Sequence, residues 1–242
     1  MDRAAGPDVT GDATLSFGKI RLLDVPHAAN VAREIFDEDC YSFDRFPRGA
    51  VVIDVGAFYG EFSIRCALEK GCRVFAYEPC PRNREIFEKN RRLNGCEGEI
   101  AISANAIGTP GSRSFLSRSD HPAGSLFAEE GARHGLTGNV SQIACVSLAD
   151  EIRAIRRLFP KTPLCVKLDC EGAEHEIFAD TAWFSEVTLL VMEWHNHDGA
   201  FFRSLLKPHG FEVTLEAGGP KPRPPWDVTI GGGLLFAIRG SR

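Results

Sequence analysis

Long apolar runs are missing from this 242-residue sequence, and no stretch approaches the length of about 18 apolar residues that a membrane-spanning helix needs. The opening residues 1–6 also lead into no apolar segment of the kind found in secretory signals. We therefore expect neither a membrane span nor secretion, and we expect a cytoplasmic protein.

Cysteine pairs of the CxxC type are also absent, although the chain has eight cysteines. Without such pairs, neither a zinc ribbon nor a thioredoxin-like redox site is predicted. Several cysteines lie inside apolar runs, as Cys165 does between Leu164 and Val166. These positions are typical of buried free thiols in a reducing compartment.

An excess of positive charge is missing as well, because the formal net charge is −5 and the isoelectric point is about 5.8. This balance argues against nucleic acid or an anionic membrane as a general partner. The basic residues spread over 82–92 are interpreted as the solvated face of a helix. The expected partner is a small molecule, and a homodimer remains open.

The chain divides into two parts by composition. Residues 1–48 are interpreted as an N-terminal tail and cap segment, with a helix predicted near 28–37 and an aromatic cluster at 41–46. The tripeptide Pro47-Arg48-Gly49 ends this segment. Residues 49–242 are expected to form the main domain.

Within the main domain, short apolar runs alternate with segments of helical periodicity. Strands are predicted at 51–55, 73–77, 100–104, 164–168, 187–192, 211–215 and 234–238, and helices at 61–70, 81–93, around 152–155 and at 200–206. Ser147 and Asp150 form a capping-box variant before the third helix. Residues 108–142, rich in Gly and Ser, and the Pro-rich stretch 220–225 are expected to be loops.

This alternation predicts βαβ units with right-handed crossovers, and hence an α/β fold with a doubly wound, mostly parallel sheet. Ligands of such sheets bind beyond the carboxyl ends of the strands. The residues that directly follow each predicted strand are therefore the candidates for a functional site.

A nucleoside-binding arrangement follows the first two strands of this domain. The segment Asp54-Val55-Gly56-Ala57-Phe58-Tyr59-Gly60 places two glycines where the backbone must turn tightly and approach a ligand. Glu78 follows the next strand, where a carboxylate can accept hydrogen bonds from both hydroxyls of a ribose.

Two cofactors compete for this arrangement. A dinucleotide site needs GxGxxG so that the pyrophosphate can bind at the helix N-terminus, whereas only GxxxG is present and Glu61 follows it. Because a carboxylate at that position repels phosphate, S-adenosylmethionine, a sulfonium cation without phosphate, is the better candidate. A dinucleotide-dependent oxidoreductase and a non-catalytic nucleoside-binding module are kept as alternatives.

Five segments together resemble a known family, the FkbM methyltransferases: 51–64, Ala76–Pro79, Leu93–Gly95, Val166–Glu174 and Glu193–His195. The pattern KxDxEGxE at 167–174 is the specific part of the match, since many methyltransferases share the glycine motif. Two departures are visible: Phe58 stands where the family usually has Asn, and Leu148-Ala149-Asp150 replaces the usual Leu-Asp-Asp.

The resemblance implies a seven-stranded class I methyltransferase sheet with a reversed last strand. It also implies that residues 49–242 form a domain that binds S-adenosylmethionine. It implies that the glycine loop contacts the methionine part of the cofactor and that Glu78 contacts the ribose. The implied cofactor-binding residues are Asp54, Gly56, Ala57, Phe58, Tyr59, Gly60, Glu78 and Asp169. Family members methylate hydroxyl groups of natural products or sugars, which implies O-methylation of a small-molecule hydroxyl. N-methylation and carboxyl methylation remain alternatives.

Methyl transfer from a sulfonium is an in-line displacement in which the acceptor oxygen must lose its proton. The candidate catalytic residues follow the fourth and fifth strands: Lys167, Asp169, Glu171, Glu193 and His195. A neutral His195 is expected to be the general base near pH 7, with a structural histidine as the alternative. Lys167 is alternatively an ion-pair partner of a nearby carboxylate, and Glu171 a group that shapes the loop at 172–173.

No metal site is assigned from the sequence. Mg²⁺ held by Asp169, Glu193 and His195 is kept as an alternative, because it would lower the pKa of the acceptor. Zinc held by His195 and His197 is disfavoured, because no thiolate is near. The acceptor itself is not identified, and residues 14–48 and 108–142 are the segments expected to cover it.

Overall fold

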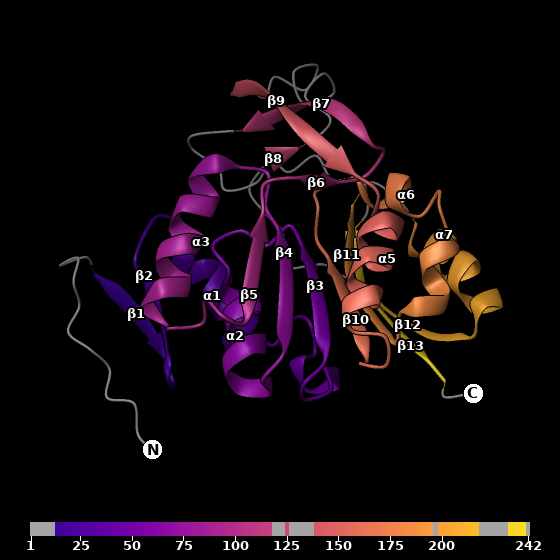
Figure 1. Cartoon of the computed structure of the whole chain (residues 1–242), viewed down its shortest axis with the longest axis horizontal. Coiled ribbons are helices and arrows are strands. Elements are labelled where there is room, and N and C mark those ends of the chain that lie inside the picture. The colour runs from indigo at the N-terminus through magenta and orange to yellow at the C-terminus, as the bar shows by residue number, and fades with distance from the viewer. Residues whose placement is uncertain (1–12, 118–123, 126–137, 196–197, 218–231, 241–242) are drawn as a thin grey trace.

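A seven-stranded sheet forms the centre of the molecule, with the strand order β12-β13-β11-β10-β3-β4-β5 (Figure 1). The computed structural model describes residues 13–117, 124–125, 138–195, 198–217 and 232–240. The strands of this sheet are β3 (Val51–Val55), β4 (Arg73–Tyr77), β5 (Ile100–Ser103), β10 (Leu164–Leu168), β11 (Leu189–His195), β12 (Phe211–Ala217) and β13 (Gly232–Arg239). Strand β13 runs antiparallel to both of its neighbours, β11 and β12, and the pairs among the other strands are parallel. The predicted α/β fold with a reversed last strand is confirmed.

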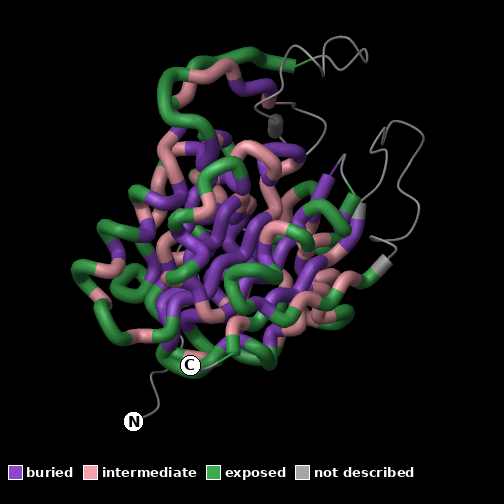
Figure 2. The backbone as a smooth tube through the Cα atoms, turned by 90° about the vertical axis from the view of Figure 1, so that its right-hand side faces the viewer, coloured by how far each residue is buried: buried purple, intermediate pink, exposed green. Residues whose placement is uncertain are grey.

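Helices cover both faces of this sheet. They are α1 (Ala28–Phe36), α2 (Glu61–Lys70), α3 (Pro81–Leu93), α5 (Leu148–Leu158), α6 (Glu174–Ile177) and α7 (Gly199–Leu206), with 3₁₀ turns η1 (Phe43–Arg45), η2 (Ala182–Glu186) and η3 (Lys207–His209). Successive side chains of a strand point to opposite faces. Val51 and Ile53 accordingly join a core with residues of α5, η2 and α7, whereas Val52 joins a second core with residues of α1 and α2. Figure 2 shows the buried strands in the middle of the molecule and the exposed residues around them.

The N-terminal segment packs against the sheet domain. Its hairpin of β1 (Thr14–Phe17) and β2 (Ile20–Leu23) is tied to α3, because the backbone amide of Leu23 donates to Asn90 Oδ1 at 2.8 Å. Tyr41, Phe43 and Phe46 are buried in the same core as Phe62 of α2. The predicted helix near 28–37 is confirmed as α1, and its position brings the segment to the carboxyl ends of the strands.

The prediction of a loop at 108–142 is wrong for much of the part of this range that the structure describes. A second sheet lies there, with the order β6-β9-β7-β8, above the carboxyl ends of the main strands (Figure 1). Its strands are β6 (Ala106–Ile107), β7 (Gly111–Ser117), β8 (Gly124–Ser125) and β9 (Asn139–Val146). Strand β9 is largely exposed and β7 is partly exposed, and their Ser, Gly and Gln residues are typical of a loop. Backbone pairing from Gly111↔Cys145 to Ser117↔Asn139 holds the two strands together.

Helix α5 begins after Ser147, as predicted, but the capping-box hydrogen bond is not formed. The side chain of Ser147 makes no capping bond, and the carboxylate of Asp150 instead pairs with Arg153 one turn along. The Pro-rich stretch 220–225 and His197 lie outside the described residues. Among the described helices, none is long and apolar enough to cross a bilayer.

Candidate active site

A cavity of about 310 Å³ opens at the carboxyl ends of β3, β4, β10 and β11. Its floor comes from the loop after β3, the end of β4, and residues 167–171 after β10. Residues of α1 and Tyr41 form one wall, and Ala106, Ile107 and Phe115 of the small sheet form another. The two segments that were expected to cover an acceptor therefore both contribute to this cavity.

The turn after β3 requires glycine at two positions, because a Cβ at either position would clash with a neighbouring group. Gly56 has a φ of +74°, and a Cβ there would lie 1.8 Å from the carbonyl oxygen of Asp169. Gly60 has a φ of +87°, and a Cβ there would lie 2.0 Å from the ring of Phe87. Between them Phe58 adopts a φ of +52°, a conformation that Asn tolerates better than Phe. The departure from the family's usual Asn therefore carries a local strain.

Glu78 connects this turn to the start of α3. Its side chain accepts hydrogen bonds from the backbone amides of Phe58 and Cys80, each at 2.9 Å, and from Asn83 Nδ2 at 3.3 Å. Burial raises the pKa of Glu78 to about 7, and these hydrogen bonds only partly offset the effect. The carboxylate lines the cavity, where it can also accept hydrogen bonds from a ligand.

Glu61 is a candidate binding residue that the sequence reasoning did not include among the site residues. It begins α2, is 1% exposed and lines the cavity. Neither carboxylate oxygen has a hydrogen-bond partner among the described residues. Burial raises the pKa of Glu61 to about 8. A buried carboxylate without a partner favours a cationic ligand, and the signal for it was the acidic residue directly after GxxxG.

Lys167 holds the loop after β3 against the end of β10. Its Nζ donates to the carbonyl oxygen of Gly56 at 2.8 Å and lies 3.1 Å from Asp54 Oδ1. Burial alone would lower the pKa of Lys167, but the charges of Asp54 and Asp169 raise it above its ordinary value. Lys167 is therefore a charged positioning residue, in agreement with the ion-pair alternative.

The predicted cofactor-binding residues separate into two groups. Lining the cavity are Gly56, Ala57, Phe58, Glu78 and Asp169, whereas Asp54, Tyr59 and Gly60 are not among the lining residues. Asp54 is fully buried behind the wall, where it accepts a hydrogen bond from Ser63. The Tyr59 hydroxyl donates instead to the carbonyl oxygen of Pro26 at 3.3 Å.

All five predicted catalytic residues lie at the ends of the neighbouring strands β10 and β11. Lys167, Asp169, Glu171 and Glu193 line the cavity. The hydroxyl of Tyr41, from the N-terminal segment, donates to Asp169 Oδ2 at 2.7 Å. Tyr41 was not predicted as a site residue, because its partner is 128 positions away in the sequence.

Glu174 organises this cluster and was also missed. Its Oε1 accepts from the backbone amides of Cys170 and Gly172, each at 3.3 Å, and lies 3.0 Å from His195 Nδ1. The loop-shaping role that was considered for Glu171 therefore belongs to Glu174, whose side chain is fully buried. Glu171 itself lines the cavity.

The surroundings of His195 favour a protonated imidazole over the neutral one expected near pH 7. His195 is 4% exposed, which by itself lowers its pKa, but the hydrogen bond to Glu174 and the charges of Glu171, Glu174 and Asp169 outweigh burial. Together they raise the pKa to about 10, which favours the charged imidazole at neutral pH. A protonated imidazole cannot take a proton from an acceptor.

Comparison with known proteins identifies the family. Residues 54–213 match the sequence profile of the methyltransferase FkbM domain, which is more than half of the chain. The chain belongs to the FkbM methyltransferase family. This FkbM-family enzyme is an S-adenosylmethionine-dependent methyltransferase, as predicted from the KxDxEGxE segment and the glycine turn.

Relatives of this FkbM-family enzyme include two fungal methyltransferases. Methyltransferase 1 of Beauveria bassiana is 24% identical, over 81% of this chain and 83% of the relative. Methyltransferase sdnD of Sordaria araneosa is 23% identical, over 87% and 91%. AMB antimetabolite synthetase AmbE of Pseudomonas aeruginosa is 29% identical, and the match covers 81% of this chain and 11% of that protein.

Solved structures resemble the fold at low sequence identity. The Pyrococcus horikoshii protein PH0793 gives a TM-score of 0.50 at 13% identity, covering 95% of this chain and 72% of that chain. A SAM-dependent methyltransferase from Agrobacterium tumefaciens gives a TM-score of 0.45 at 11% identity, covering 98% and 72%.

The residues of the cavity fit S-adenosylmethionine better than a dinucleotide. The carboxylates of Glu61 and Glu78 face the same space, together with those of Asp169, Glu171 and Glu193. A pyrophosphate would be repelled by this lining, whereas a sulfonium and an ammonium group would be attracted to it. The buried, unpartnered carboxylate of Glu61 is the observation that fits a cationic cofactor.

Proposed function

We propose that this enzyme methylates a hydroxyl oxygen of a small molecule that binds in the cavity. The observation that carries the proposal is the group of carboxylates at the ends of β10 and β11, Asp169, Glu171 and Glu193, which lines the same cavity as Glu78. A hydroxyl acceptor needs a proton acceptor beside it as the new bond forms. These carboxylates supply one.

The same carboxylates disfavour the alternative acceptors. A carboxylate acceptor would be repelled by the acidic lining. An amine acceptor would be held in its ammonium form, because neighbouring negative charges raise its pKa, and an ammonium group has no lone pair with which to attack. A hydroxyl is neutral on entry and avoids both costs.

In the proposed complex, the residues near the glycine turn bind different parts of the cofactor or hold the turn in position. Glu78 accepts hydrogen bonds from the ribose hydroxyls, and Glu61 faces the ammonium group of the methionine part. The backbone at Gly56 and Ala57 approaches the cofactor closely because Gly56 has no Cβ. Lys167, which lines the cavity, and Asp54, behind its wall, hold this turn in place.

S-adenosylmethionine, when bound, supplies a methyl group on a sulfonium sulfur. We assign the proton-accepting role to Glu193, whose side chain is 13% exposed and lines the cavity. As the oxygen–carbon bond forms and the carbon–sulfur bond breaks, the hydroxyl proton passes to the Glu193 carboxylate, and the products are a methyl ether and a neutral thioether. His195 Nε2 lies 3.6 Å from Glu193 Oε1.

The Glu78→Ala variant is expected to bind S-adenosylhomocysteine about 1–3 kcal/mol more weakly than the wild type, roughly 5- to 150-fold in Kd. The reason is the loss of hydrogen bonds between a charged acceptor and the ribose hydroxyls. Titration calorimetry measures the change, and Glu85→Ala on the exposed face of α3 is the matched control. An unchanged affinity in a folded Glu78→Ala variant would remove Glu78 from the cofactor site.

Cofactor affinity is expected to fall at acid pH because of Glu78. Its pKa is about 7, and hydroxyl donors bind the charged carboxylate, so the bound complex favours deprotonation. The Kd for S-adenosylhomocysteine should therefore be nearly constant well above pH 7 and rise by up to about tenfold per pH unit below it. Titrations of wild type and Glu78→Gln over about pH 5.5–8.5 measure this dependence.

The Glu78→Gln variant should lose this part of the pH dependence, and any slope that remains near pH 8 belongs to Glu61, whose pKa is about 8. Identical pH profiles for wild type and Glu78→Gln would show that Glu78 does not titrate on cofactor binding.

The proposed reaction is tested by turnover with S-adenosylmethionine against a panel of matched alcohols, amines and carboxylic acids. Mass spectrometry should detect the methylated product from a hydroxyl compound together with an equal amount of S-adenosylhomocysteine. Methylation of amines or acids alone would overturn the choice of acceptor.

A further inference from the structure

One nitrogen in the carboxylate cluster is buried without a hydrogen bond. His195 is 4% exposed, and its Nε2 has no hydrogen-bond partner among the described residues. The nearest charged atoms are Glu193 Oε1 at 3.6 Å and Glu171 Oε2 at 3.7 Å, too far for hydrogen bonds. A buried polar atom of this kind costs free energy unless a ligand satisfies it.

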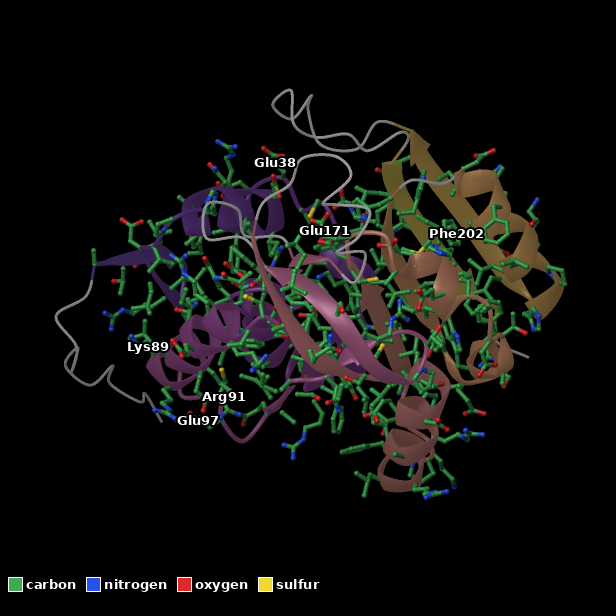
Figure 3. All side chains as sticks on the ribbon, turned by 90° about the horizontal axis from the view of Figure 1, so that it is seen from above. Glu38, Lys89, Arg91, Glu97, Glu171 and Phe202 are labelled. Carbon is green, nitrogen blue, oxygen red and sulfur yellow. The ribbon has the colours of Figure 1, made fainter. Side chains whose placement is uncertain are left out.

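The surroundings of this nitrogen match a metal centre. Asp169, Glu171 and His195 each offer one ligand atom, and these atoms lie within 4.8 Å of one another. Viewed from the side of the small sheet, Glu171 lies near the middle of the molecule, between the N-terminal and C-terminal elements (Figure 3). Two of the three residues, Asp169 and Glu171, also line the proposed acceptor cavity.

Outer hydrogen bonds already orient two of these three side chains. Glu174 Oε1 accepts from His195 Nδ1, which leaves Nε2 as the atom that faces the cluster. Tyr41 donates to Asp169 Oδ2, which holds that carboxylate beside the cluster. A carboxylate–histidine pair behind a ligating nitrogen and a hydrogen-bonded ligating carboxylate are typical of protein metal sites.

We propose that Asp169, Glu171 and His195 bind a divalent transition-metal ion of the Mn²⁺ type beside the acceptor. One imidazole and two carboxylates leave open positions for the acceptor oxygen and water, and an imidazole donor favours such an ion over Mg²⁺. This set differs from the one considered from the sequence, because Glu171 replaces Glu193. Binding displaces any proton from Nε2, since the ligating imidazole must be neutral there.

The proposed ion specifies how the hydroxyl acceptor is bound, and this role rests on the proposed O-methylation. A hydroxyl bound to the ion has a lower pKa and a fixed position, and its proton still passes to Glu193 as the methyl group is transferred. The site therefore separates two tasks: three residues hold the ion, and the fourth carboxylate takes the proton.

The experiment measures Mn²⁺ binding directly, with no turnover needed. Chelator-treated full-length protein is titrated with Mn²⁺, and the loss of the free-ion electron paramagnetic resonance signal gives the stoichiometry and Kd. Electron spin-echo modulation of the bound ion then reports whether an imidazole nitrogen ligates it. The expected result is one Mn²⁺ per chain with one coordinated imidazole nitrogen.

Three variants locate the ion. Glu171→Gln removes a ligand, and Glu174→Gln removes the partner that orients His195; each is expected to weaken Mn²⁺ binding by about 10- to 100-fold. Glu85→Gln is the matched control, because it removes one carboxylate from the exposed face of α3 and is expected to change Kd less than about threefold, since exposed charges are screened by salt. Thermal unfolding monitored by circular dichroism confirms that each variant is folded.

Weak or absent Mn²⁺ binding by the wild type, a missing imidazole signal, or equal effects of Glu171→Gln and Glu85→Gln would each overturn the metal site. Titration of the same samples with S-adenosylhomocysteine separates this outcome from failure of the proposed function. Protein that binds S-adenosylhomocysteine but no Mn²⁺ loses only the metal site, and protein that binds Mn²⁺ but no S-adenosylhomocysteine loses the proposed reaction.

Discussion

The Glu193→Gln variant is expected to have a kcat about 10²- to 10⁴-fold below that of the wild type, the usual contribution of a positioned acid–base group. Glutamine has nearly the same shape as glutamate but cannot take the hydroxyl proton. The affinity for S-adenosylhomocysteine should stay nearly unchanged, because Glu61 and Glu78, the carboxylates assigned to the cofactor, are on other elements. Steady-state and single-turnover kinetics measure the loss at the chemical step.

Two comparisons make this result specific. Glu193→Asp keeps a carboxylate and should recover part of the rate, whereas a purely structural glutamate would give no such recovery. Glu85→Gln removes the same charge from the exposed face of α3 and should leave kcat within about threefold, since exposed charges are screened by salt. A Glu193→Gln enzyme that keeps most of its single-turnover rate would show that the proton leaves by another route.

Much of the main sheet could be predicted from local sequence. The strands β3, β4 and β10 have the predicted bounds, because short apolar runs that are buried on both faces leave an unambiguous pattern. The helix α2 also begins and ends as predicted, with Gly71 at a φ of +65° after its last turn. Patterns that depend only on neighbouring residues were sufficient for these elements.

The small sheet was not predictable in this way. Strands β7 and β9 have few buried side chains, so their sequences lack the alternation that indicates a strand. Their stability comes from backbone pairing between residues about 20–35 positions apart, and composition carries no signal for such pairing. Gly111 and Ser117 lie within these paired strands although both are typical loop residues.

The candidate site shows the same division between local motifs and distant partners. The motif residues at the ends of β10 and β11 were predicted to come together, and the structure places these two strands side by side. Tyr41 and Glu174 were missed because their importance depends on contacts with Asp169 and His195 that only the fold creates. The raised pKa of His195 was not predictable for the same reason, since a single sequence does not show that three carboxylates surround one imidazole.

The Gly56→Ala variant is expected to lose about 3 kcal/mol or more of unfolding free energy, among the largest effects of any small substitution. Two costs combine at this position. A left-handed φ costs a residue with a Cβ about 1–2 kcal/mol, and the new Cβ would lie 1.8 Å from the carbonyl oxygen of Asp169. Because that oxygen is backbone, the loop after β3 and the end of β10 must separate to make room.

Gly95→Ala is the matched control for this substitution. Gly95 has a φ of +62°, and no atom lies within 4 Å of the position of its Cβ. The free energy of unfolding of Gly95→Ala should therefore fall by only about 1 kcal/mol, the cost of the left-handed conformation. Urea unfolding of both variants isolates the cost of the close approach, and titration calorimetry should show that only Gly56→Ala weakens S-adenosylhomocysteine binding. Equal losses of stability, with cofactor affinity retained in both, would mean that the turn does not require its contact with Asp169.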